Sequence, residues 1–336
     1  MSLGYTPAVE VTGANAGLIN AGLIDWEYVD AAGVQSDTLR LTVSTEGIEG
    51  LPSVDGKIGF RRGYKESGLV DAGEFVITRV TPQLFPSQLQ IVATAAPFKV
   101  ADETEFKARR SASYGPTTLG AVFRELAGRH GFSPRIAPEL DAVKLEHVDQ
   151  SNETDMGFLT RIARQYDAVT KPVNELYVMA RRGQLKSLSG KTLPVMTISI
   201  TNNNRPGDAA FIQASLDEDS RAKFKGTRTT WWDAATGKEN VVETGEKPFK
   251  KVRQRYQNEA EAKDAAEGEL RKVKRSAYKV QIDCPGNPGY GAEGLVVLDD
   301  SWPSFMRQQW SIDKVTERGS RGQSYRCTIE ASVPLE

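Results

Sequence analysis

The sequence is poor in the residues that metal and nucleophilic chemistry require. It contains two cysteines and two histidines among 336 residues. Neither His130 nor His147 has a histidine, cysteine or carboxylate partner at metal-ligand spacing, and no Gly-x-Ser-x-Gly elbow accompanies them. We therefore predict no catalytic residue, no cofactor and no bound metal. For His130 we expect a capped or hydrogen-bonded structural role.

Long apolar runs and an excess of one charge are also missing. No run of 18 apolar residues exists, so no membrane-spanning segment is predicted. The apolar stretch 14–24 contains two asparagines and lacks a basic leader, so we do not expect a signal peptide. Lys and Arg number 43 and Asp and Glu number 44, a net charge of -1. Without a basic excess we expect neither sequence-specific nucleic-acid binding nor a membrane partner.

The two cysteines, Cys284 and Cys327, both lie near the C-terminus in strand-like contexts. A buried, reduced pair is the favoured interpretation, because free cysteine behaves as a small apolar residue in protein cores. A disulfide between them is the alternative. Their pairing stays open at the level of sequence.

Clear secondary-structure signals follow one another between Thr117 and Gly183. Residues 119, 122, 123, 126 and 127 are apolar at helical spacing. Thr117 or Thr118 can cap this helix, and Gly131 can end it in the left-handed conformation. A short strand is predicted at 143–148. A second helix is predicted with the apolar stripe Met156, Leu159, Ile162, Ala163 and Tyr166, capped by Ser151 or Asn152. Strands 168–172 and 176–180 complete a small α/β module.

This segment carries a family resemblance. The pattern Gln-x-x-Glu-x-Asp-x-x-Phe-Leu-x-Arg is present at Gln150, Glu153, Asp155, Phe158, Leu159 and Arg161. Residues 150–166 resemble the signature of the phage late control protein D family, the baseplate hub proteins of contractile-tailed phages, and a related pattern occurs in the VgrG spike proteins of type VI secretion. Residues 118–120, 129–132, 232–237 and 285–288 also resemble that family.

The regions on either side of the module are rich in predicted strands. Residues 39–43, 75–80 and 89–94 read as strands of a small barrel or sandwich. After residue 184, we predict strands at 195–201, 278–284, 294–298, 310–316 and 324–332, a hairpin over 223–243, and a helix from about 259 to 276 capped by Asn258. The predicted fold class is α+β, mostly β, with domains at 1–97, 98–183 and 184–336.

The resemblance implies a specific architecture and function. It implies that 1–97 and 184–336 form two tail-tube-like barrels flanking the α/β module, and that the chain is a non-enzymatic structural hub in the virion tail baseplate, made in the host cytoplasm. It further implies a homotrimer that joins the six-fold tail tube to the three-fold spike, beside other baseplate proteins. The alternative is a tail component that binds or degrades peptidoglycan through the module. A DNA-binding regulator is the third possibility, and we do not expect it.

Three further patterns are tempting as sites. Residues 189–192, Ser-Gly-Lys-Thr, lack the first glycine of a phosphate-binding loop, since that position is Leu185. Glu153 and Asp155 form a carboxylate pair, but residues two apart do not share a helix face, and we favour a role at the helix start. Trp231 and Trp232 point to opposite faces of a strand, so we expect one in the core and the other at a rim or interface.

Overall fold

The fold is mostly β, with strands far outnumbering helices, which confirms the predicted α+β class. The computed structural model describes residues 5–13, 15–32, 36–46, 50–95, 108–173, 176–181, 195–219 and 223–334. The tempting Ser-Gly-Lys-Thr run at 189–192 lies outside these residues. In the part of the chain that is described, no helix combines the length and apolarity needed to span a membrane.

The chain folds into two compact units. Unit 1 comprises Met1–Pro97, Pro194–Leu216 and Val280–Ala331, and unit 2 comprises Phe98–Leu193, Asp217–Lys279 and the last five residues. Strands from both ends of the chain therefore belong to unit 1. The division into domains at 1–97, 98–183 and 184–336 stays a prediction.

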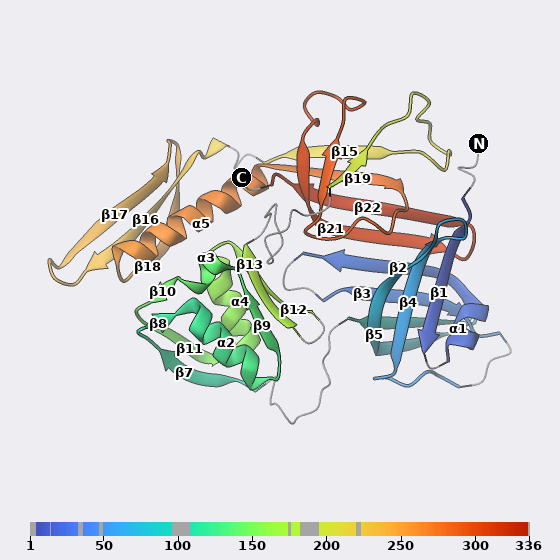
Figure 1. Cartoon of the computed structure of the whole chain (residues 1–336), viewed down its shortest axis with the longest axis horizontal. Helices are drawn as coiled ribbons and strands as arrows, with labels where there is room; N and C mark the ends of the chain where they lie inside the picture. The colour runs from blue at the N-terminus through green and yellow to red at the C-terminus, as the bar shows by residue number, and fades with distance from the viewer. Residues whose placement is uncertain are drawn as a thin grey trace. The chain divides into compact units, whose positions relative to one another are not determined.

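Unit 1 is built on a sheet with the order β1-β4-β5-β6-β3-β2-β21-β22-β19-β15, to which β20 and β14 add through β21 (Figure 1). Helix α1 spans Ala16–Gly22. The strands are β1 (Pro7–Gly13), β2 (Leu23–Ala31), β3 (Thr38–Ser44), β4 (Lys57–Tyr64), β5 (Gly68–Gln83), β6 (Gln88–Thr94), β14 (Val195–Ile198), β15 (Gln213–Glu218), β19 (Tyr278–Pro285), β20 (Leu295–Leu298), β21 (Gln309–Ser320) and β22 (Ser324–Ser332).

One strand pair joins the two ends of the chain within this sheet. β2 runs antiparallel to β21, from Asp25 opposite Ser320 to Ala31 opposite Lys314. The predicted strands are present, but their local alternation of apolar and polar residues carried no information on this long-range pairing. Because backbone hydrogen bonds cross from β2 to β21, the N-terminal and C-terminal strands form one continuous sheet instead of two separate ones.

The core of unit 1 follows the two-residue period of its strands. In β3, Leu39, Leu41 and Val43 are at most 3 % exposed, whereas Arg40 between them is exposed. Trp26 from β2 packs edge-on against Phe60 from β4, with ring centroids 5.2 Å apart. In these strands the apolar face therefore points inward, as the sequence pattern predicts.

The first part of unit 2 is the predicted α/β module. Its elements are β7 (Arg110–Tyr114), β8 (Thr117–Thr118), α2 (Leu119–Arg129), β9 (Ser133–Ile136), α3 (Pro138–Asp141), β10 (Lys144–Leu145), β11 (Val148–Glu153), α4 (Asp155–Gln165), β12 (Ala168–Val173) and β13 (Leu176–Arg181). Apolar side chains of α2 and α4 share one buried core with β13. Thr118 caps α2 by accepting from Ala121 N, and Gly131 has the expected positive φ of 76°.

The cap of α4 differs from the prediction. Thr154, not Ser151 or Asn152, accepts a hydrogen bond from the backbone of the first turn, at Gly157 N. Ser151 and Asn152 belong to β11, which pairs with β7 through a bulge between Gln150 and Glu153. Pairing with β7, which the local sequence does not reveal, therefore extends the strand and moves the helix start two or three residues along the chain.

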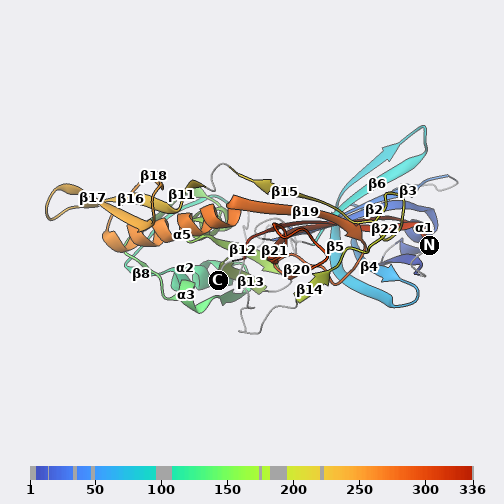
Figure 2. The same ribbon diagram turned by 90° about the horizontal axis from the view of Figure 1, so that it is seen from above.

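The second part of unit 2 is a three-stranded sheet with one helix on it. The order is β17-β16-β18, with β16 at Gly226–Asp233, β17 at Lys238–Gly245 and β18 at Phe249–Tyr256. Helix α5 (Glu259–Ala277) lies along one face of this sheet (Figure 2). The Thr227 and Thr229 hydroxyls donate to the carbonyls of Ala266 and Ala262, which fixes the helix on the sheet. Asn258 caps α5, as predicted.

Candidate functional site

The family-like motif forms a buried polar cluster centred on Asp155. Its side chain is 2 % exposed, and its carboxylate accepts from Gln150 Nε2 at 2.8 Å and Arg129 Nη1 at 3.0 Å. His130 Nε2 lies 2.9 Å from the same carboxylate. Burial opposes ionisation, but the hydrogen bonds and the charge of Arg129 outweigh it and lower the pKa of Asp155. The cluster fastens α2 and β11 to the first turn of α4.

Glu153 and Arg161 form a second contact of the motif. Arg161 Nη2 donates to Glu153 at 2.8 Å and to the Asp149 carbonyl at 2.6 Å, and its guanidinium lies over the Phe158 ring, 5.2 Å from the ring centroid. The hydrogen bond from Arg161 lowers the pKa of Glu153. Glu153 and Asp155 therefore have different partners, which supports the predicted structural role over a catalytic pair.

The two histidines have carboxylate neighbours that spacing alone did not reveal. His130 is buried against Asp155, in agreement with its predicted hydrogen-bonded role. His147 Nε2 lies 3.1 Å from Asp149 on the surface, two residues along the chain. Within the described residues, no three His, Cys, Asp or Glu side chains gather as metal ligands would.

Helices α4 and α5 approach closely within unit 2. A Cβ added at Gly268 would lie 2.4 Å from the Gln165 carbonyl oxygen, so only glycine permits this separation. Arg275 donates to both carboxylate oxygens of Asp167, at 2.5 and 2.9 Å. The glycine contact and this ion pair hold the C-terminal part of α5 against the end of α4.

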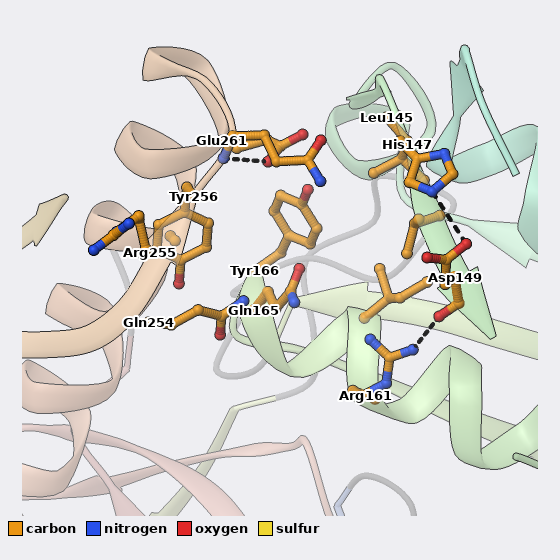
Figure 3. A pocket seen from close by; sticks show the side chains of 14 residues that line it. Leu145, His147, Asp149, Arg161, Gln165, Tyr166, Gln254, Arg255, Tyr256 and Glu261 are labelled. Atoms are coloured by element: carbon orange, nitrogen blue, oxygen red, sulfur yellow. Dashed lines mark hydrogen bonds and ion pairs between the residues drawn. The ribbon is translucent and has the colours of Figure 1, made fainter. Parts of the chain in front are cut away.

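At the other end of α5 the two helices enclose a pocket of about 260 Å³. It is lined by the chain from β10 to β11, by α4, by the end of β18 and by the first turns of α5. In Figure 3, Gln165 and Tyr166 lie at the centre of the lining, between the His147–Asp149 pair and the residues Gln254 to Tyr256.

The pocket is polar and nearly balanced in charge. Glutamines contribute much of its lining, at positions 165, 254 and 257. Asp149 and Arg161 carry opposite charges on one side, and Arg255 and Glu261 do so on the other. Burial raises the pKa of the Tyr166 and Tyr256 hydroxyls, so both stay neutral at pH 7. Such a lining suits an uncharged ligand with amide or hydroxyl groups, and it holds no nucleophile beside a base.

The tryptophan pair on β16 behaves as the strand period requires. Trp232 is 42 % exposed, and the Arg255 guanidinium lies 5.6 Å from its ring centroid. Trp231, the next residue along, points with Thr227 and Thr229 toward the α5 face. The exposed tryptophan therefore marks the sheet face that α5 leaves open.

The cysteines of unit 1 are free and buried. Burial raises the pKa of the Cys284 thiol to about 12 and that of Cys327 well above its ordinary value. A thiol that stays protonated is a poor nucleophile. This agrees with the favoured prediction of a reduced pair in the core.

Solved structures with a similar fold include phage tail proteins and a type VI secretion component. A tail protein from Neisseria meningitidis MC58 superposes with a TM-score of 0.67 at 11% identity, over 98% of this chain and 97% of that one. The 43 kDa tail protein of prophage MuSo2 from Shewanella oneidensis gives 0.63 at 12% identity, over 97% and 98% of the two chains. An E. coli type VI secretion component gives 0.53 at 12% identity, over 94% and 74%. At these identities the likeness establishes the fold alone.

Sequence comparison identifies the family. The family described as "Phage tail baseplate hub (GPD)" matches residues 105–323, and the chain belongs to it. The "Probable baseplate hub protein" of Escherichia phage P2 is 30% identical over 190 residues, which are 56% of this chain and 48% of the relative. Its counterpart in Escherichia phage 186 is 28% identical over 184 residues, 54% and 46% of the two. The chain spans about half the length of the curated relatives it matches.

Proposed function

We propose that this chain is the structural baseplate hub of a contractile phage or prophage tail, and that three copies form a ring joining the six-fold tube to the three-fold spike. The observation that carries the proposal is the sheet of unit 1. It combines strands from residues 7–94 with strands from 195–332 through the β2–β21 pair. Each copy thus supplies two sets of strands within one hydrogen-bonded sheet.

Symmetry gives this arrangement its function. Most soluble oligomers close with point-group symmetry, and a three-fold ring presents each surface of the subunit three times. Two strand sets per copy present six similar positions to a hexameric tube, while the ring keeps the three-fold symmetry of a spike. The membership in the baseplate hub family and the fold shared with tail proteins support this role.

The same proposal makes the chain a non-enzymatic protein of the virion baseplate, made in the host cytoplasm. Its partners are the tail tube protein, the tail spike protein and other baseplate proteins. Support comes from the site geometry, in which Glu153, Asp155 and His130 are occupied by structural contacts. We propose no cofactor and no metal.

Co-expression with the tube and spike proteins of the same tail tests the proposal. We expect electron microscopy of the purified complex to reveal a ring of three copies between the tube and the spike, with a hub mass three times the 36.8 kDa of one chain. A complex that contains one or two copies, or a spike that binds the tube equally well without this chain, would contradict the proposal.

One observation favours a second candidate, peptidoglycan binding. The pocket of about 260 Å³ in unit 2 is charge-balanced and rich in glutamine, whose amides can donate to and accept from the hydroxyl and amide groups of a sugar. The test is retention of the whole chain on purified sacculi. The candidate is established if the wild type is retained, Gln165→Ala/Gln254→Ala is not, and the control Glu125→Ala, on the exposed surface of α2, still is. Equal retention of all three proteins, or none, would exclude it.

A further inference from the structure

The face of the β17-β16-β18 sheet opposite α5 is exposed and partly apolar. Thr227 and Thr229 point to α5, so Thr230 and Trp232 point to the open side. Trp232 is 42 % exposed, and Val241, which lies opposite Thr230 on β17, is 56 % exposed. Large apolar side chains on a sheet face indicate an interaction surface when they cluster with a polar rim. We call this surface the outer face.

The rim of the outer face is positively charged. Residues 223–256 contain nine Lys and Arg but four Asp and Glu, a net charge of +5 in a chain whose total is -1. Arg228 and Arg255 are paired with glutamates of β17. Lys247, Lys251 and Arg253 have no carboxylate partner within the described part of the chain. A surface with unpaired cations around an apolar centre fits an acidic partner with an apolar centre.

Unit 1 carries a surface of the complementary kind. A groove of about 120 Å³ between α1, the end of β3 and residues 50–52 is lined by Leu18, Leu51 and Pro52, with Leu18 51 % and Leu51 59 % exposed. Glu46 and Asp55 follow lining segments at its border, and both are exposed without a cation partner among the described residues.

The N-terminal part of the chain, to which this groove belongs, also has a net charge of the required sign. Residues 1–97 contain eleven Asp and Glu but six Lys and Arg, a net charge of -5. The two regions, 1–97 and 223–256, thus carry opposite charges of equal size in a chain that is nearly neutral overall. Eight of the large exposed apolar side chains also lie between residues 5 and 85. Two of these eight, Leu18 and Leu51, line the groove itself.

We propose that the outer face of one copy docks on the groove of unit 1 in a second copy of this chain. Trp232 and Val241 cover Leu18 and Leu51, and Lys251 and Arg253 face Glu46 and Asp55. This inference rests on the proposed function, because it assigns the contact between neighbouring copies in the hub. The contact joins two different surfaces, so it is heterologous: it closes into a ring when the rotation between copies allows, and it is not the self-complementary contact of a two-fold dimer.

A second copy fits the observations better than a nucleic acid or an unrelated protein. Both surfaces are present on the same chain, within segments whose net charges are +5 and -5. A polyanion would use the cations but would leave Val241 and the apolar groove exposed. Complementary charges accelerate encounter and set the register, and salt screens them beyond about 10 Å at 0.1 M. Self-association is therefore expected to weaken with salt.

The test is the oligomeric state of the purified full chain by analytical ultracentrifugation. We expect association at about 0.05 M salt that weakens at about 0.5 M. Lys251→Glu/Arg253→Glu should weaken it by at least about tenfold, and Glu46→Lys/Asp55→Lys added to that variant should restore it.

The matched control is Arg135→Glu/Lys144→Glu, the same charge change on two exposed residues of the α/β module, and it should leave association unchanged. Trp232→Ala should weaken association at both salt concentrations.

Three outcomes would overturn the inference. The first is a wild-type chain that stays monomeric at low salt. The second is a Lys251→Glu/Arg253→Glu variant that associates like the wild type and has an unchanged circular dichroism spectrum. The third is binding of the wild type to a short DNA duplex, with that binding lost in the same variant. Co-expression with tube and spike separates the two proposals. If the variant still enters a three-copy ring, this contact is wrong and the hub function stands, whereas a wild-type chain that forms no ring contradicts the function itself.

Discussion

Arg62 on β4 and Glu317 on β21 form a buried, two-pronged ion pair. Arg62 Nε donates to Oε2 at 3.0 Å and Nη2 to Oε1 at 2.8 Å, between residues 255 positions apart. The side chains are 6% and 0% exposed. Tyr325 also donates its hydroxyl to this carboxylate, at 2.5 Å. The pair thus links the N-terminal and C-terminal strands of unit 1 through side chains, as β2 and β21 link them through the backbone.

Loss of one partner of this pair should destabilise unit 1 strongly. Arg62→Met leaves Glu317 buried without its cation, which costs about 3–5 kcal/mol. Urea unfolding of the full chain measures the loss, and hydrogen exchange of β4 and β21 localises it. The neighbouring Arg61–Glu10 pair is a matched control, because its side chains are 45% and 44% exposed and Arg61→Met should cost less than about 1 kcal/mol.

Replacement of both buried charges distinguishes the pair from simple packing. Arg62→Met/Glu317→Leu removes the desolvation penalty together with the attraction, so it should lose less stability than Arg62→Met alone. A double variant that loses the sum of both single losses would contradict a direct coupling. An Arg62→Met loss equal to that of Arg61→Met would contradict the burial of the pair.

Asp155 should make the stability of unit 2 sensitive to acid. Its pKa is lowered below the ordinary 3.8, so the folded state holds a proton less readily than the unfolded state. The stabilisation is fully present above that ordinary value and is lost as the pH falls through the lowered pKa. Asp155→Asn should cost about 2–3 kcal/mol at neutral pH, and its difference from the wild type should shrink below the ordinary pKa.

Urea unfolding between neutral pH and about pH 3 measures this difference. The control is Asp141→Asn, which removes a half-exposed carboxylate paired with Arg124 and should change stability by less than about 1 kcal/mol. A constant gap between the wild type and Asp155→Asn across this range would show that the carboxylate charge contributes nothing.

Local patterns in the sequence determined most elements but few of their partners. The apolar stripe of α5, from Ala262 to Val273, and its cap Asn258 are local features, and both predictions are confirmed. The cap of α4 was predicted wrongly because β7 extends β11 through Ser151 and Asn152. Pairing between segments some forty residues apart has no local signature, and helix-cap preference cannot compete with it.

The site shows the same limit. The motif residues Gln150, Asp155 and Arg161 were recognised from sequence, but the contacts of Asp155 with Arg129 and His130 require α2 and α4 to be folded together. The pocket beside α5 was not predicted. Its two sides come from residues 145–166 and 254–265, which are brought together by the close contact at Gly268. The only signal in the sequence was a glycine in the middle of a long helix, where alanine is intrinsically favoured.

Gly268 provides a sharp test of the α4–α5 contact. Alanine normally stabilises a helix interior by about 1 kcal/mol relative to glycine, but its Cβ would lie 2.4 Å from the Gln165 carbonyl oxygen. We expect Gly268→Ala to destabilise unit 2 because the backbone of α4 must move. Gly128→Ala on α2 is the control, since a Cβ there meets open space, and it should be stabilising. Thermal unfolding compares the two, and stabilisation by both would refute the close packing.

Cys284 and Cys327 should be unreactive in the folded protein and reactive once it unfolds. They are 1% and 0% exposed, and the Cys327 sulfur accepts a hydrogen bond from Asn287 N at 3.4 Å. The pKa of about 12 for Cys284 leaves almost no thiolate at pH 8.

We expect iodoacetamide to add no group to the native chain and two groups in urea without reductant, as measured by intact mass. Ser substitution at each position should reduce the number in urea to one, which controls for reaction elsewhere. No addition in urea would mean that the two cysteines form a disulfide, and rapid addition to the native chain would mean that this part of unit 1 opens to solvent.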